Sequence, residues 1–120
     1  MYYPFFDVCP VPALEPNIIS LVKERELAPG EQVTFGEFKS TTLVVAFRTE
    51  SNGRFLLYLE ELRDSEWVVA DKTAGYEGVT LWQCLLKNPV FRVRVKNTTQ
   101  APITLTIDMN LFQPISQKEE

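Results

Sequence analysis

The chain of 120 residues contains no histidine and only two cysteines, Cys9 and Cys84. Histidine is the commonest general base near neutral pH, so its absence removes the usual nucleophile–base pairs. Two cysteines without histidine cannot supply the four side-chain ligands of an ordinary structural zinc site. No ordered set of nucleophile, base and oxyanion donors is recognisable elsewhere in the sequence. We therefore predict a protein that is not an enzyme and that has no catalytic residues, no metal and no cofactor.

Long apolar runs and an excess of positive charge are also missing. No stretch reaches the ~18 apolar residues that mark a membrane span. The N-terminus lacks the basic region and continuous apolar segment of a secretory signal. The net charge is −4, so a general attraction to nucleic acid or to an anionic membrane is not expected. We predict neither nucleic acid nor membrane as a partner.

Strict alternation of apolar and polar residues is the strongest pattern present. It runs through residues 91–96 and again through residues 103–111, and a period of two is typical of strands with one dry face. Residues 97–102 between them form a turn cluster, and Pro102 suits the start of a strand. We expect a β-hairpin whose apolar face is covered by a second sheet.

Short β-rich runs fill most of the remaining chain, at residues 32–38, 41–49, 55–62, 66–71 and 79–86. Asn52-Gly53 is a hairpin signal between two of them, and residues 73–80 are expected to form a loop. Residues 17–27 fit either a helix or a strand, with a strand followed by a turn favoured. The pattern predicts an all-β protein, a single antiparallel β-sandwich or jelly roll of seven to eight strands.

The first 16 residues differ from the rest, since they hold four of the eight prolines. Such a segment is expected to be an extended N-terminal arm, followed by a sandwich domain at residues 17–113 and a frayed acidic tail at 114–120. The arm is too apolar to stay in water. It docks either on its own sandwich or on a neighbouring copy, through four aromatic residues and a cysteine: Tyr2, Tyr3, Phe5, Phe6 and Cys9.

Three side-chain groups are candidate sites, each with a structural alternative. Aromatic residues that could stack on a glycan are Tyr58, Trp67, Tyr76 and Trp82, although strand cores also need such side chains. An acidic cluster comprises Glu60, Glu61, Asp64, Glu66 and Asp71. It could build a calcium site or a glycosidase pair, but it is read mainly as a solvated turn and strand edge. A basic stripe, expected to be balanced across the hairpin by Asp108, comprises Arg92, Arg94 and Lys96.

The two cysteines can be free thiols or form a disulfide, depending on the redox state of the compartment. In a reducing compartment both are free thiols, with Cys84 as a small core residue. In an oxidising one, Cys9 and Cys84 could form a disulfide within one chain or between chains.

Four features carry a resemblance to a known family: the arm, the Leu27-Ala-Pro-Gly-Glu31 turn, the strand containing Glu66-Trp67 and the Phe91–Asn97 segment. Together they resemble the small jelly-roll subunits of bacterial surface fibres, especially spore appendages. More loosely, they are similar to phage tail or decoration domains. The resemblance implies that Met1–Pro16 is a connector reaching into the next subunit, with Cys9 as its cross-linking residue. Those connectors usually carry several cysteines, whereas this arm has one. The resemblance also implies assembly at a cell, spore or virion surface rather than a plain cytoplasmic protein.

The sequence thus favours a non-enzymatic structural subunit that self-assembles into a fibre or another homopolymer through its arm and sheet edges. The alternative is a monomeric or low-oligomer binding module for a glycan or a protein.

Overall fold

The computed structural model describes residues 14–114, and every regular element in that range is a β-strand. No helix long and apolar enough to cross a membrane occurs in this range. The strands are β1 (Leu14–Glu15), β2 (Ile18–Leu27), β3 (Gln32–Lys39), β4 (Val44–Ser51), β5 (Phe55–Arg63), β6 (Glu66–Gly75), β7 (Gly78–Leu85), β8 (Val90–Asn97), β9 (Ile103–Asn110) and β10 (Gln113–Pro114).

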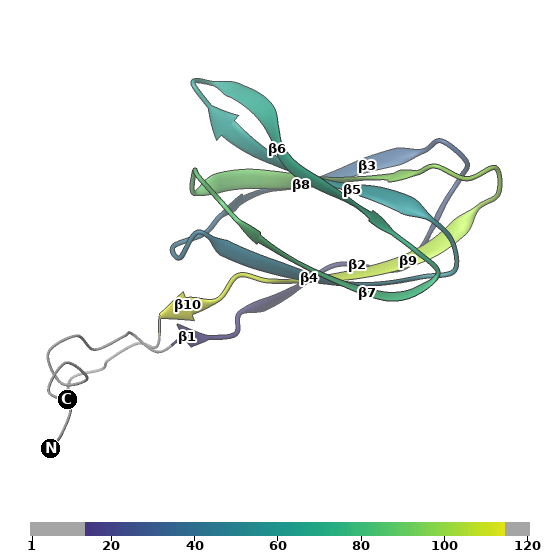
Figure 1. Cartoon of the computed structure of the whole chain (residues 1–120), viewed down its shortest axis with the longest axis horizontal. Helices are drawn as coiled ribbons and strands as arrows, with labels where there is room; N and C mark the ends of the chain where they lie inside the picture. Colours follow the sequence, from purple (N-terminus) through teal and green to yellow (C-terminus); the bar gives the residue numbers. More distant parts are fainter. Residues whose placement is uncertain (1–13, 115–120) are drawn as a thin grey trace, which may run out of the picture.

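Two four-stranded antiparallel sheets face each other (Figure 1). One has the order β2-β9-β4-β7 and the other has the order β3-β8-β5-β6. From β2 to β9, the chain changes sheet at each connection except the one between β5 and β6, which is the strand order of a jelly roll. The predicted fold class is therefore confirmed. The core between the sheets is made of alternate residues from both, among them Val45, Phe47, Phe55, Leu57, Leu59, Phe91, Val93, Val95, Leu105, Ile107 and Met109.

The predicted hairpin at residues 91–111 is wrong. Strand β8 pairs with β3 and β5, whereas β9 pairs with β2 and β4 in the other sheet. The connection between them crosses from one sheet to the other and is held by Asn97, whose side chain is fully buried. Its amide nitrogen donates to the carbonyl oxygens of Leu27, Ala28 and Ala101 at 2.9–3.1 Å. Alternation therefore identified the dry face of each strand correctly but not its partner strand.

Of the other expectations from the sequence, some are confirmed and some are wrong. Residues 18–27 form a strand, as favoured. Of the run expected at 41–49, residues 44–49 lie in β4, an interior strand between β9 and β7. Residues 73–80, expected to be a loop, belong mostly to β6 and β7. The pair Asn52-Gly53 joins strands of different sheets rather than a hairpin. A Cβ atom at Gly53 would lie 2.5 Å from Ile103 Cγ2, so glycine is needed there because the chain passes close to β9.

A two-residue turn closes the hairpin of β5 and β6. Arg63 pairs with Glu66, and the intervening Asp64 and Ser65 have φ angles of 52° and 68°. Two successive positive φ angles define a type I′ turn, which favours glycine at its second position. The β-rich runs expected at residues 55–62 and 66–71 placed this connection correctly.

Replacing Ser65 by glycine should raise the free energy of unfolding by about 0.5–1 kcal/mol, because it removes the strain of a side chain at positive φ. Urea denaturation followed by circular dichroism measures the change. Ser20→Gly, at an exposed position inside β2, is the matched control and should lower stability by about the same amount. Equal effects of both substitutions would contradict this assignment of the turn.

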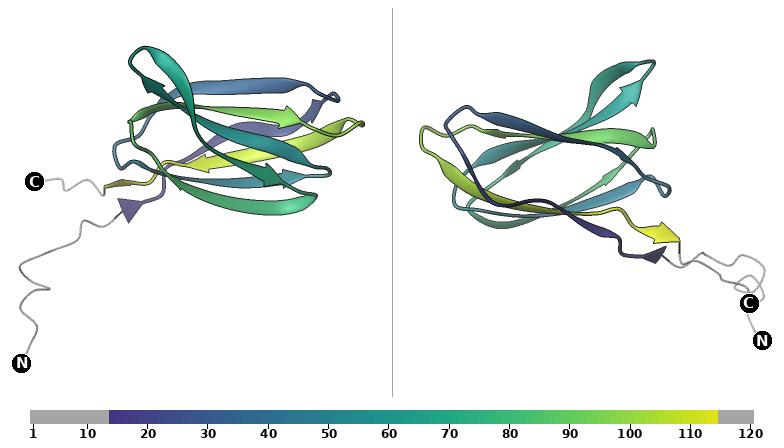
Figure 2. Two further views of the ribbon diagram at one scale, coloured as in Figure 1. Left: turned by 45° about the horizontal axis from the view of Figure 1, so that its top comes forward. Right: turned by 180° about the vertical axis from the view of Figure 1, so that it is seen from behind.

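Both ends of the described chain leave the sandwich together. Strands β1 and β10 pair and extend beyond one end of the sandwich (Figure 2). The Gln113 side chain donates to Glu15 at 2.8 Å, and Leu111 N donates to the carbonyl of Asn17 at 2.9 Å. Residues 1–13 and 115–120, which contain most of the predicted arm and tail, lie outside the described residues, so the division into arm, domain and tail stays a prediction.

Candidate functional site

Three of the four edge strands in the described sandwich carry features that oppose pairing with another chain. Strand β2 has two register shifts against β9 and an unbroken charged run, Lys23–Glu26. Strand β3 has a shift between Gly36 and Phe38. Strand β6 carries charged residues and leaves Ala70 unpaired opposite β5. Bulges and charges of this kind are how sheet edges avoid edge-to-edge association.

The fourth edge strand, β7, has none of these features. Its sequence, Gly-Val-Thr-Leu-Trp-Gln-Cys-Leu, contains no charged residue. It pairs with β4 from Gly78 to Leu85 without a register shift. Three of its outward side chains are largely exposed, Val79 at 53%, Leu81 at 73% and Leu85 at 76%. A straight, uncharged edge strand with exposed aliphatic side chains is a template for strand pairing.

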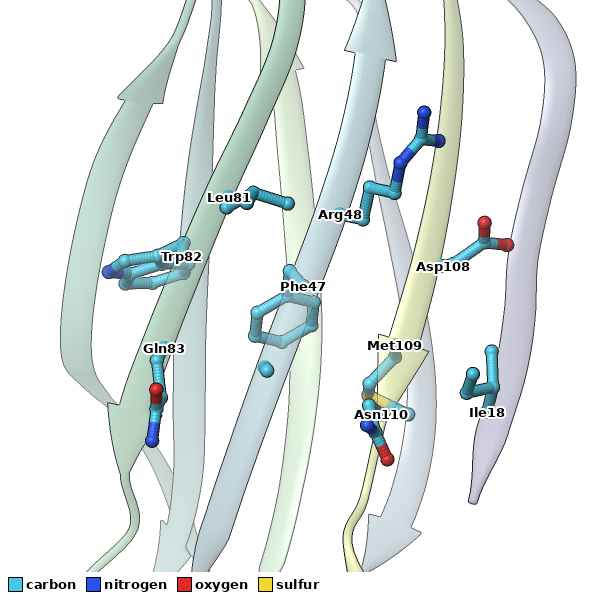
Figure 3. A pocket seen from close by; sticks show the side chains of 10 residues that line it. Ile18, Phe47, Arg48, Leu81, Trp82, Gln83, Asp108, Met109 and Asn110 are labelled. Carbon is cyan, nitrogen blue, oxygen red and sulfur yellow. The ribbon is translucent and has the colours of Figure 1, made fainter. Parts of the chain in front are cut away.

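The outer face beside β7 is hollowed into an open groove of about 540 Å³. Figure 3 shows Leu81 and Gln83 from β7 on one side of the groove and Ile18 from β2 on the other. Between them lie side chains of β4 and β9, with Arg48 and Asp108 toward one end. Ile18 is itself 65% exposed. Edge and groove thus form one continuous apolar surface with a few polar groups.

The opposite sheet has a different outer face, which is occupied by its own ion pairs. Glu60 accepts hydrogen bonds from Arg92 Nε at 2.6 Å and from Arg94 Nε at 3.0 Å. The guanidinium of Arg92 lies 4.4 Å from the ring centre of Trp67, and that of Arg94 lies 4.0 Å from the ring centre of Tyr58. These contacts satisfy the charges and cover the aromatic faces from one side.

The prediction that Asp108 balances the charge of the basic stripe is therefore wrong. Asp108 lies on β9 in the other sheet, directly opposite Arg48 of β4. Arg92 and Arg94 are instead neutralised by Glu60, one residue of the acidic cluster that was read as a solvated turn. Glu60 is only 6% exposed, so that reading is wrong for this residue as well.

Glu61, the next residue, is fully buried and ties two loops together. Its carboxylate accepts from Lys87 N at 2.7 Å, from Arg63 Nη2 at 2.8 Å and from Asn88 Nδ2 at 3.3 Å. Arg63 belongs to the end of β5, whereas Lys87 and Asn88 form the connection from β7 to β8. A buried carboxylate is stable only with several such donors, and Glu61 therefore fixes the end of β7 against the other sheet.

The pKa values of these two carboxyl groups are lowered. Burial by itself raises the pKa of Glu60, but hydrogen bonds from Arg92 and Arg94 outweigh it, so the pKa falls below its ordinary value of 4.5. Burial likewise raises the pKa of Glu61, and the Lys87 amide, Arg63 and Asn88 together outweigh it. Both groups are therefore ionised in the folded protein throughout the neutral range.

We expect stability to fall at acid pH for this reason. Below about pH 4.5 the unfolded chain binds protons at both glutamates while the folded chain does not, so acid favours unfolding until the pH passes the folded pKa values. Urea midpoints measured between pH 7 and pH 3 should decrease over that acid range. Glu60→Gln should make the decrease shallower, and Glu66→Gln, at an exposed position, should leave it unchanged. An unchanged midpoint from pH 5 to pH 3 would contradict the assignment.

The four aromatic residues considered for glycan stacking are not brought together. Trp67 lies at the start of β6 and Tyr76 directly follows its end. The Arg54 guanidinium lies 5.3 Å from the Tyr76 ring centre. Trp82 stacks on Phe47 with ring centres 5.5 Å apart and also borders the groove. Glycan contact at these residues stays a prediction, although Trp82 packs against the core beside the buried Phe47.

Cys84 is a core residue, 3% exposed. Burial, with a contribution from the charge of Asp71, raises the pKa of its thiol to about 12, so the reactive thiolate is scarce near neutral pH. Cys9 lies outside the described residues, as do Tyr2, Tyr3, Phe5 and Phe6, and the disulfide stays a prediction. Within residues 14–114, no three metal-ligating side chains gather into a site.

Comparison with known proteins shows the fold. No protein-family model and no curated protein matches the sequence. The solved structure of the PBSX exported protein XepA is similar, with a TM-score of 0.69, 13% identity and 87% of this chain covered. The chain spans 39% of that protein's length. A Cowpea mosaic virus particle protein is a weaker match, with a TM-score of 0.48, 10% identity and coverage of 90% of this chain and 92% of that one. Neither comparison adds support for spore appendages in particular.

Sequence reasoning did not single out β7. Residues 79–86 were read as an apolar strand, which is correct, but a strand at the edge cannot be told from a central one by composition. The available signal was a strand of eight residues without any charge whose alternate positions include Val79, Leu81 and Leu85.

Proposed function

We propose that this protein is a non-enzymatic structural subunit that self-assembles into a fibre or another homopolymer through its N-terminal arm and its sheet edges. The observation that carries the proposal is the contrast between β7 and the three other edge strands. Strands β2, β3 and β6 carry bulges or charges, whereas β7 is straight, uncharged and aliphatic. This contrast is expected of a protein that uses one sheet edge for association. The likeness to XepA supports the jelly-roll fold alone.

A homopolymer also needs a second contact, because one self-complementary surface produces closed dimers only. The N-terminal arm, residues 1–16, is the proposed second contact, with Tyr2, Tyr3, Phe5 and Phe6 as its apolar anchors and Cys9 as a covalent link. In this proposal the sandwich is residues 17–113, and the assembly is a surface fibre of the kind formed by spore appendages.

Light scattering and negative-stain microscopy of the purified full chain test the proposal. We expect particles much heavier than the 13.8 kDa monomer. Deletion of residues 1–12 should remove the large particles while leaving the β-type circular dichroism spectrum. A monodisperse 13.8 kDa species at all concentrations would contradict the proposal, and loss of the fold on deletion would show that the arm belongs to its own core.

The open groove beside β7 favours a second candidate, a binding module for a glycan or a protein. It combines an apolar floor with four polar side chains at its rim: Arg48, Gln83, Asp108 and Asn110. Polar groups around an apolar hollow are typical of ligand sites. A glycan array signal that is lost in Gln83→Ala and Asp108→Ala, from a protein that stays monomeric, would support this function over assembly.

A further inference from the structure

We propose that β7 pairs antiparallel with β7 of a second copy, about a two-fold axis at Trp82, so that the two β2-β9-β4-β7 sheets become one continuous sheet. The inference rests on the proposed function and deepens it, because it names the partner of the free edge and the register of the contact. It follows from the backbone pattern of β7, its side chains and the protection of the other edges.

The alternation of hydrogen bonds shows which backbone groups of β7 have no partner within residues 14–114. Leu86 N donates to Leu43 O at 2.8 Å, in continuation of the β4–β7 ladder, and Thr80 O accepts from the Thr49 hydroxyl at 3.2 Å. Successive residues of a strand direct their N–H and C=O groups to opposite sides. Residues 80, 82 and 84 therefore face β4, and the residues whose groups point to the open side are Val79, Leu81, Gln83 and Leu85.

This pattern restricts the register of a symmetric pair. Free residues must oppose free residues, because only they can exchange hydrogen bonds across the new contact. With the axis at Trp82, Val79 opposes Leu85 of the partner subunit and Leu81 opposes Gln83 of the partner subunit, so every free residue of β7 is paired. Shifting the axis to Leu81 leaves Leu85 opposite a residue of the turn before β7, and one pairing is lost.

Side-chain chemistry agrees with a second copy as the occupant. Opposed residues of an antiparallel pair lie on the same face. The exposed Val79 and Leu85 would then cover each other on the outer face, and the aliphatic part of Gln83 would cover Leu81. No like charges meet, since β7 carries none. The contact is thus self-complementary, which a two-fold interface requires.

Cysteine pairing tests the register. Leu81→Cys and Gln83→Cys are made separately in a full-length Cys9→Ser chain, one of them isotopically labelled, then mixed and mildly oxidised. The buried Cys84 is common to all samples. Directly opposed residues have Cα atoms about 5.5 Å apart, within reach of a disulfide. We expect the mixed dimer, linking positions 81 and 83, to exceed either self-linked dimer at least tenfold by mass spectrometry. Val69→Cys, at an exposed position on β6, should give no specific dimer.

The alternative outcomes separate the two proposals. Predominant linkage of position 81 to position 81 would overturn the register with its axis at Trp82. Assembly seen by light scattering without any linkage through residues 81 and 83 would overturn the β7 contact and leave the structural function standing. A chain that stays monomeric, as it would if another protein supplied the added strand, would overturn both.

Discussion

Replacing Glu61 by alanine should lower the free energy of unfolding by about 3–5 kcal/mol, the largest effect expected of any polar substitution in the sandwich. The carboxylate is fully buried and accepts hydrogen bonds from the Lys87 amide, Arg63 and Asn88. Its removal leaves a buried amide without an acceptor and a guanidinium without its counter-charge. Urea denaturation at pH 7, followed by circular dichroism, gives the difference.

Two variants show whether the loss comes from this network. Glu61→Gln keeps an acceptor oxygen but not the charge, so it should lose about half as much. Glu50→Ala removes a carboxylate that is 61% exposed and 3.8 Å from Arg48, and it should change stability by less than about 0.5 kcal/mol. If Glu61→Ala were no more harmful than Glu50→Ala, the role given to Glu61 in holding the β7–β8 connection would be wrong.

Replacing Leu81 by lysine should weaken self-association at least a hundredfold while leaving the fold intact. Leu81 is 73% exposed in the single chain, so the substitution has little effect on the monomer. In the proposed contact it places an ammonium group on each side of the axis, and the residue directly opposite it on β4 is the like-charged Arg48. Charges on an edge strand are also a natural means of preventing pairing. Sedimentation velocity over a range of concentrations measures the change.

Val69→Lys is the matched control for this prediction. Val69 is also an exposed aliphatic residue on an edge strand, at 46%, but it lies on β6 beside the unpaired Ala70. It should leave the association constant within a factor of about two. Equal weakening by both substitutions would indicate a general effect of net charge on association, and dissociation by Val69→Lys alone would place the interface on β6.

The sequence predicts where the strands lie and which face of each is buried, but not which strands pair with each other. Alternation in residues 91–96 and 103–111 correctly identifies the side chains that fill the core, because a period of two assigns each residue to one face. Whether two successive strands pair or cross to opposite sheets depends on the connection. Here the buried Asn97 holds a crossing, and its three acceptors come from segments up to seventy residues away in the chain.

The candidate site was predictable only in part. The absence of charge in β7 is visible in the sequence, but its position at the edge depends on the order of all the strands. Glu60 and Glu61 look like members of an exposed acidic turn, since the arginines and amides that bind them lie 26–34 residues away, apart from Arg63. Such long-range partners leave no local signal.

Hydrogen exchange at β7 tests the central claim most directly. Among residues 14–114 the amides of Val79, Leu81, Gln83 and Leu85 have no partner strand, whereas the proposed contact gives each a carbonyl partner. Exchange of these four amides should therefore slow at least tenfold as the protein concentration rises through the range in which light scattering shows association, and should return on dilution. Exchange that stays fast at these positions while the particle mass increases would show that the copies meet elsewhere.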